Sequence, residues 1–172
     1  VKTQIMPKIE DIMLGKVSIS HFRDVQVEDL LGREPVELDI KSISKTLTGK
    51  TILVTGAGGS IGSEICRQVS RFIPKKLILL GHGENSIYEI DLELRNKYQG
   101  QFELIPVIAD IQDRNRIFEV VKEHRPDVIY HAAAHKHVPL MEFNPKEAVK
   151  NNIIGTKNVA EAADQFDVKT FV

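Results

Sequence analysis

From Lys50 onward, short runs of apolar and β-branched residues alternate with longer segments in which apolar residues recur at helical spacing. The runs predict strands at 51–54, 76–80, 104–109 and 127–130, with a fifth that begins near Lys169. The segments between them predict helices at about 60–72, 85–98, 114–124 and 145–165. Elements that alternate in this way form βαβ units, so we expect an α/β fold with a doubly wound parallel sheet, incomplete at the C-terminus.

Residues 1–49 follow a different pattern, in which short apolar clusters are mixed with charges and turn signals such as Glu34-Pro35. We interpret this part as a short helical arm or linker that precedes one globular domain over 50–172. Two roles stay open for the arm. In the first, the arm has a function: it docks or oligomerises, or it reaches a cofactor through Arg33. In the second, it only links the domain to a preceding one.

The composition narrows the class of protein. A chain of 172 residues holds one main hydrophobic core. With 23 Lys and Arg against 24 Asp and Glu, the net charge of -1 provides no basic field, so we do not expect nucleic acid as the main partner. The single cysteine, Cys66, excludes an internal disulfide framework and indicates a reducing compartment, which favours the cytoplasm.

We interpret both ends of the chain as cut. It starts without Met, and it ends at VKTFV, inside an apolar, β-branched run typical of a strand. No stretch reaches the roughly 18 to 20 apolar residues that a membrane span needs, so we expect any membrane contact to come from a region outside this chain.

The most informative segment is TILVTGAGGSIGSEICRQ at 51–68, where a strand leads directly into glycines and then into an amphipathic helix. We expect Gly56 to permit the tight turn, Gly59 to let the backbone approach a pyrophosphate, and Gly62 to let the helix pack against the strand. The N–H groups of Ser60 to Gly62, with the Ser60 hydroxyl, would face the phosphates. The spacing differs from G-x-G-x-x-G and from a P-loop, but its context favours dinucleotide binding over a merely structural turn.

Two acids follow the second and third predicted strands. Glu84 lies about 20 positions after the glycines, where an acid binds the adenosine ribose hydroxyls and favours NAD over NADP. NADP stays open because Gly81 ends the strand, and Glu84 is also suited to the first turn of a helix. Asp110 is a candidate acceptor for the adenine amino group, with Ile111 against the ring. Alternatively, Asp113 caps the next helix and Asp110 lies in a turn.

The loop YHAAAHKHVP follows the fourth predicted strand. Its small residues Ala132, Ala133 and Ala134 would allow a nucleotide to pass close to the backbone. We expect Lys136 and His137 to meet an anionic substrate such as a sugar diphosphate, although a solvated basic loop stays the alternative. The histidines of this loop lack the helical context of an H-x-x-x-H site, the only cysteine is remote and no acid lies between them, so we expect no metal site.

These motifs resemble a known group of enzymes. TGAGGSIG, ADIQD and YHAAA, in this order, resemble the extended short-chain dehydrogenase/reductase superfamily, whose fold is Rossmann-like and binds NAD(P). Together with DLLGREPV, GENSIYEIDLEL and HAAAHKHVPLMEFNPKEAVKNNIIGTKNV, they resemble the UDP-N-acetylglucosamine 4,6-dehydratases of bacterial polysaccharide and capsule biosynthesis, over about residues 5–172. This resemblance implies a nucleotide-sugar lyase whose NAD takes hydride from C4 and returns it to C6, after the C5 proton and C6 hydroxide have left.

The resemblance also assigns residues and partners. The residues implied in cofactor binding are Gly56, Gly59, Ser60, Ile61, Gly62, Glu84, Asp110, Ile111, Ala132, Ala133, Ala134 and Asn151. Those implied on the sugar-nucleotide side are Lys136, His137 and Val138. The family resemblance further implies a homo-oligomer at the cytoplasmic face of the membrane, anchored through a region outside this chain.

The catalytic residues are expected beyond Val172. The superfamily uses Tyr-x-x-x-Lys, often with Met for Tyr in this subfamily, and no Tyr or Met of this chain has Lys four positions later. We therefore predict that these residues alone bind cofactor weakly at best and show no turnover. A nucleotide-sugar 4-epimerase of the same superfamily and a non-catalytic dinucleotide sensor are the alternatives.

Overall fold

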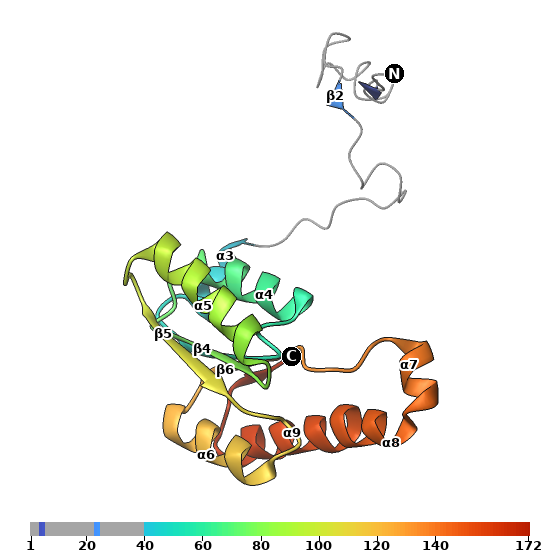
Figure 1. The fold of residues 1–172 in the computed structure, drawn as a ribbon. Helices are drawn as coiled ribbons and strands as arrows, with labels where there is room; N and C mark the ends of the chain where they lie inside the picture. The colour runs from blue at the N-terminus through green and yellow to red at the C-terminus, as the bar shows by residue number, and fades with distance from the viewer. Residues whose placement is uncertain (1–3, 6–22, 25–39) are drawn as a thin grey trace. The chain divides into compact units, whose positions relative to one another are not determined.

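The computed structural model describes residues 4–5, 23–24 and 40–172 (Figure 1). The chain divides into two compact units, residues 1–39 and 40–172. In the first unit, β1 (Gln4–Ile5) and β2 (Arg23–Asp24) form an antiparallel pair, so the described residues before Ile40 are extended, whereas the last part of the predicted helical arm is a helix over Ile40–Leu47. Most of that arm, Arg33 included, lies outside the described residues.

The second unit is built on a five-stranded sheet of order β5-β4-β3-β6-β7. All of its pairings are parallel. Its strands are β3 (Thr51–Thr55), β4 (Lys76–Gly81), β5 (Glu103–Ile108), β6 (Val128–His131) and β7 (Thr170–Phe171). The chain runs outward from β3 to β5 and then returns to β6 on the other side of β3. The predicted doubly wound sheet is therefore confirmed, and its order reverses between β3 and β6, where such folds form their ligand crevice.

Helices cover both faces of this sheet, with α3, α4 and α5 on one face and α6 and α9 on the other (Figure 1). The first group is α3 (Ile40–Leu47), α4 (Ser60–Ser70) and α5 (Glu84–Tyr98). The second group is α6 (Arg114–His124) and α9 (Thr156–Gln165). Because both faces are covered, the central strands are apolar at successive positions instead of alternating.

The segment predicted as one helix over 145–165 has three parts. These are α8 (Pro145–Ala148), the π-helix η1 (Val149–Gly155) and α9, and a short helix α7 (Val138–Phe143) that the sequence did not predict precedes them. A π-helical turn inside an α-helix is uncommon and often marks a functional segment.

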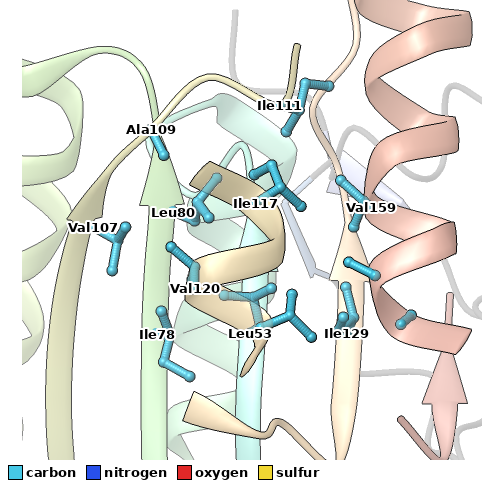
Figure 2. Close-up of a cluster of buried hydrophobic side chains, with 13 residues drawn as sticks. Leu53, Ile78, Leu80, Val107, Ala109, Ile111, Ile117, Val120, Ile129 and Val159 are labelled. Carbon is cyan, nitrogen blue, oxygen red and sulfur yellow. The ribbon is translucent and has the colours of Figure 1, made fainter. Parts of the chain in front are cut away.

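The core consists of two clusters separated by the sheet. Figure 2 shows the cluster under α6 and α9, where Leu53, Ile78 and Ile129 of three strands meet Ile117 of α6 and Val159 of α9. These side chains are at most 1% exposed. This packing fixes the carboxyl ends of the strands, which carry the loops of the candidate site.

The second cluster explains where the globular unit begins. Leu47 of α3 is buried with Ile52, Cys66 and Ile87 on the other face of the sheet. The compact unit therefore starts at Ile40, whereas the predicted boundary between residues 49 and 50 assigned this helix to the arm.

Candidate functional site

The glycine turn after β3 brings three backbone segments into close contact. Gly56 has a left-handed backbone (φ 66°), and a Cβ there would lie 2.7 Å from the carbonyl oxygen of Ala132. A Cβ on Gly62 would collide with the carbonyl oxygen of Gly56. Glycine at these two positions lets β3 turn tightly into α4 while the loop after β6 passes alongside.

The first turn of α4 begins at this glycine turn. Gly59 is its N-cap, and the N–H of Gly59 donates to the carbonyl of Gly56 (2.9 Å). The first N–H groups of a helix have no partner within the helix, and the positive end of the helix dipole lies behind them. In α4 these groups belong to Ser60, Ile61 and Gly62, of which Ser60 and Ile61 are exposed and Gly62 is buried. This end of α4 is therefore suited to an anion.

A cavity of about 230 Å³ opens at the carboxyl edge of the sheet, over the point where the strand order reverses. It brings together seven of the residues predicted to bind cofactor, namely Gly56, Gly59, Ile111, Ala132, Ala133, Ala134 and Asn151. Eight further residues line it, namely Gly58, Leu80, Gly81, His82, Gly83, Ser86, Ala109 and His135.

Sequence reasoning missed Gly58, although it stands within the same glycine run. A Cβ on Gly58 would collide with the side chain of Ser86 at the start of α5. The hydroxyl of Ser86 donates to the carbonyl of Gly83 (3.0 Å), which closes the turn between β4 and α5. The signal for Gly58 was its place between Gly56 and Gly59 in the glycine cluster, whereas Ser86 carried none.

The two predicted acids lie outside the lining of this cavity. Glu84 begins α5, is exposed, and lines a separate groove with Tyr88 and Ile108. The carboxylate of Asp110 accepts from the N–H of Gln112 (2.9 Å), and Asp113 caps α6. Both acids thus occupy the alternative positions that the sequence left open, in a first helical turn and in a loop turn.

One wall of the cavity is the segment after β5. Ile111 is buried, and its carbonyl accepts from the side-chain amide of Asn158 in α9 (3.0 Å). The same amide donates to the carbonyl of Gln112 (3.2 Å). Gly155 leaves room for this wall, because a Cβ there would lie 2.5 Å from Cδ1 of Ile111.

The opposite wall is the loop after β6. Its first residue is held by the N–H of Ala132, which donates to the carbonyl of Thr55 (3.1 Å). Asn151 of η1 is buried beside this loop and lines the cavity. Small alanine side chains line the cavity here, and the passage of a nucleotide along their backbone stays a prediction.

His131, the last residue of β6, directly precedes this loop. Its Nδ1 is hydrogen-bonded to Oγ1 of Thr55 (2.7 Å), and its Nε2 to Oγ1 of Thr156 (2.9 Å). Burial lowers the pKa of the His131 imidazole, so the ring is neutral at neutral pH.

Among the described residues no group of three His, Cys, Asp or Glu side chains is arranged to hold a metal ion.

A second cavity, of about 270 Å³, adjoins the first and shares Gly59, Ala132, Ala134 and His135 with it. Its other lining residues are Ser60, Ile61, Lys136, His137, Leu140 and Met141. The predicted substrate residues Lys136 and His137 therefore lie together beside the N-terminus of α4, while Val138 lies outside this lining. No carboxylate belongs to the lining, so Lys136 and the helix terminus make this cavity favourable for an anion.

Comparison with known proteins identifies the family. Residues 52–172 match the family described as "Polysaccharide biosynthesis protein". The capsular polysaccharide biosynthesis protein CapD of Staphylococcus aureus is 64% identical over 97% of this chain and 28% of CapD. The probable polysaccharide biosynthesis protein EpsC of Bacillus subtilis is 60% identical over 100% of this chain and 29% of EpsC. The chain thus spans less than a third of the length of these relatives.

More distant relatives include an enzyme of known reaction. The UDP-N-acetylglucosamine 4,6-dehydratase (inverting) of Campylobacter jejuni is 34% identical over 70% of this chain and 34% of its own length. The X-ray structure of Pen from Bacillus thuringiensis aligns with a TM-score of 0.67 at 33% identity, over 73% of this chain and 38% of that one. A UDP-glucose-4-epimerase from Stenotrophomonas maltophila aligns with a TM-score of 0.63 at 26% identity, over 71% and 35%.

The family match over residues 52–172 includes all the residues that line the two cavities. In the part of the chain that the structure describes, no helix has the length and apolar character to span a membrane. The sequence resemblance is confirmed at the level of the family, and so is the Rossmann-like fold. The chain belongs to the polysaccharide biosynthesis protein family within the extended short-chain dehydrogenase/reductase superfamily.

Proposed function

We propose that this chain is the NAD-binding part of a nucleotide-sugar 4,6-dehydratase that acts on UDP-N-acetylglucosamine in polysaccharide or capsule synthesis. The observation that carries the proposal is the pair of adjoining cavities at the crevice of the sheet, one lined by glycines and the other by Lys136 and His137. The 34% identity to the dehydratase of Campylobacter jejuni supports the reaction.

The residues of the first cavity fit a dinucleotide. A Cβ at Gly56 would collide with the backbone of Ala132 and one at Gly58 with Ser86, so glycine at both positions permits the tight turn that lines the cavity beside the N-terminus of α4, where a pyrophosphate would bind. Ile111 and Ser86 would hold the adenosine half, and Asn151 with Ala132 to Ala134 the nicotinamide half. The epimerase structure from Stenotrophomonas maltophila contains bound NAD, which supports this assignment.

The choice of NAD over NADP rests on charge. A 2′-phosphate is usually bound by arginine, and the lining of the first cavity contains no Arg or Lys. Glu84 lies close along the chain to His82 and Gly83, which would flank the adenosine ribose. We therefore assign NAD, with NADP as the alternative that a direct comparison of the two affinities decides.

When bound, NAD supplies reversible hydride acceptance, which allows oxidation at sugar C4 and reduction at C6 without net redox change. The residues of this chain bind and orient. The N-terminus of α4 would face the cofactor phosphates, and Lys136 and His137 the substrate diphosphate. Proton transfer at C5 and C6 is assigned to residues beyond Val172.

A 4-epimerase is the second candidate, because the epimerase from Stenotrophomonas maltophila shares this fold at 26% identity. A non-catalytic dinucleotide sensor is the third. Incubation of the whole protein with UDP-N-acetylglucosamine distinguishes them by NMR of the product. A 4-keto-6-deoxy sugar supports the dehydratase, a C4 epimer supports the epimerase, and unchanged substrate with retained NAD binding supports the sensor.

The same assay tests the division of the protein. We propose an arm that ends before Ile40 and a cofactor domain over 40–172, which moves the predicted boundary because Leu47 is buried in the core of this domain, with the acid and base groups elsewhere. Residues 1–172 alone should bind NAD weakly and convert no UDP-N-acetylglucosamine, because no Tyr-x-x-x-Lys or Met-x-x-x-Lys is present. A 4-keto product from these residues alone would contradict this division.

We also propose a homo-oligomer at the cytoplasmic face of the membrane, attached through a region outside this chain. This proposal rests on the resemblance of the sequence motifs to the dehydratase family. Sedimentation of the detergent-solubilised whole protein and fractionation of cells test it. A monomer, or a protein that stays in the soluble fraction at full length, would contradict it.

A further inference from the structure

The loop Ala132–His137 lines both cavities, and its backbone is hydrogen-bonded at few points. It is held at its ends, where the N–H of Ala132 donates to Thr55 and the carbonyl of His137 accepts from the N–H of Met141 (3.1 Å). Between these ends, residues 134–137 are exposed. The position of the wall shared by the two cavities therefore depends on what holds the middle of this loop.

The middle of the loop is held by one side chain from the π-helix η1. The N–H of His135 donates to Oδ1 of Asn152 (2.8 Å), and the carbonyl of His135 accepts from Nδ2 of Asn152 (2.9 Å). Both bonds link residues that are 17 positions apart in the sequence, and together they engage the N–H and the carbonyl of a single residue, His135. A carboxamide is the side chain that offers a donor and an acceptor side by side.

The orientation of this carboxamide is itself fixed. Oδ1 of Asn152 also accepts from Nδ2 of Asn151 (2.9 Å), so the oxygen faces two donors and the nitrogen faces a carbonyl. A flipped amide would place N–H groups against both donors. Asn151 lines the first cavity, whereas Asn152 belongs to the lining of neither.

We propose that Asn152 is a positioning residue, which holds His135 and thereby the wall that the cofactor cavity shares with the substrate cavity. Asn152 acts through the loop and touches neither ligand. The proposal rests on the proposed function only in naming NAD as the ligand of the first cavity. Asn158 holds the opposite wall in the same way, through Ile111, so the two walls can be tested separately.

The test compares NAD with ADP, which lacks the nicotinamide riboside. Asn152→Ala in the whole protein should weaken NAD binding roughly tenfold, the effect of about 1.4 kcal/mol, as expected for two lost hydrogen bonds. Binding of ADP should change much less, because the adenosine half faces Ser86 and Ile111. Calorimetry gives both affinities, and the amide of His135 should exchange its hydrogen faster in the variant.

Two variants serve as controls. Asn152→Asp keeps the acceptor for the N–H of His135 but places a carboxylate oxygen against its carbonyl oxygen, which repels it, so it should weaken NAD binding at least as much as Asn152→Ala. Asn144→Ala removes a matched carboxamide bond, from Nδ2 to the carbonyl of Leu140 (2.9 Å), and should leave NAD affinity unchanged. A melting temperature measured for each variant separates positioning from general destabilisation.

The proposal is overturned if Asn152→Ala binds NAD as the unmodified protein does. Equal losses for NAD and ADP that follow the melting temperature would also overturn it, because they indicate only a structural role. If the unmodified protein binds no NAD, the proposed function fails. Hydrogen exchange of the His135 amide then tests only whether Asn152 holds the loop. Unchanged exchange of that amide in Asn152→Ala would show that Asn152 does not hold the loop.

Discussion

At the scale of single residues, Gly155 shows how packing overrides helix propensity. Alanine is normally better than glycine within a helix, by up to about 1 kcal/mol. At Gly155, however, a Cβ would lie 2.5 Å from Cδ1 and 2.6 Å from Cγ1 of Ile111, and Ile111 lines the first cavity. A substitution must therefore move Ile111 or the helix.

We expect Gly155→Ala to lower the free energy of unfolding by about 1 to 3 kcal/mol, as overpacked cores do, and to weaken NAD binding. Urea unfolding and calorimetry measure the two effects. In the background of Ile111→Ala, which removes both colliding atoms, the added methyl group should cost little. Additive effects of the two substitutions would contradict a direct collision.

His131 gives a pH dependence of known sign. Burial lowers the pKa of its imidazole below the usual 6.5, so the unfolded chain binds the proton more readily than the folded one. The stabilisation is therefore complete above pH 6.5 and is lost as the pH falls toward the lowered pKa. His131→Gln removes this titration.

We expect the unfolding free energy of the unmodified protein to fall more steeply between pH 7 and pH 5 than that of His131→Gln. Urea titrations at several pH values measure both slopes, and the difference between them isolates His131 from the other histidines. Parallel slopes would show that protonation of this ring does not oppose folding.

The two acids show the limit of prediction from spacing. The spacing of Glu84 from the glycines is that of a ribose-binding acid, and in the structure Glu84 begins α5 and lines another groove than Gly83 and Ser86, so its contact with a ribose stays a prediction. Spacing determines the distance along the chain, but not which side of a helix terminus a residue takes. Asp110 has a local hydrogen-bond partner two residues on, which short acidic side chains commonly find in turns.

At the scale of elements, strands were predicted well and the long C-terminal helix less well. Buried parallel strands leave an unmistakable pattern of continuous apolar residues, as in Leu77 to Leu80. The π-helix leaves almost none, because one wider turn changes the periodicity of a helix only slightly. The consequence is functional, since Asn151 and Asn152 belong to that turn.

The edge strand β5 illustrates how an element avoids wrong partners. The N–H groups of Glu103 and Ala109 donate toward β4, so by alternation Leu104, Pro106 and Ile108 present their backbone groups outward. Pro106 has no N–H, and Nη2 of Arg95 donates to the carbonyl of Leu104 (2.9 Å). Proline and a cation at an edge hinder pairing with another chain.

We expect Pro106→Val to increase aggregation, because it restores an outward N–H and adds a residue with high strand propensity next to the exposed Ile108. Light scattering at rising protein concentration and temperature measures this change. Pro139→Val provides a control, since Pro139 is also exposed but lies in the first turn of the helix α7. Equal scattering from the two variants would argue against protection of the edge by Pro106.

At the scale of the whole molecule, the extent of the globular unit is the feature that the sequence placed differently. The change of hydrophobic pattern at Lys50 suggested that the fold begins there. In the structure, Leu47 of α3 is 3% exposed and packs into the cluster with Ile52 and Cys66. One buried side chain in a short helix produces too little periodicity to be recognised among the polar residues around it.

Leu47→Ala therefore tests where the fold begins. Removing a buried leucine side chain costs about 2 to 5 kcal/mol, so the variant should unfold at lower urea concentration, whereas a leucine in a solvated arm would cost little.

Cys66 supplies an independent readout, because burial raises the pKa of this only thiol to about 12 and the folded protein should react slowly with thiol reagents at neutral pH. Loosened packing in Leu47→Ala should speed that reaction, while Leu92→Ala, at an exposed position on α5, should not. Unchanged stability and thiol reactivity in Leu47→Ala would return α3 to the arm and move the start of the domain to the predicted boundary.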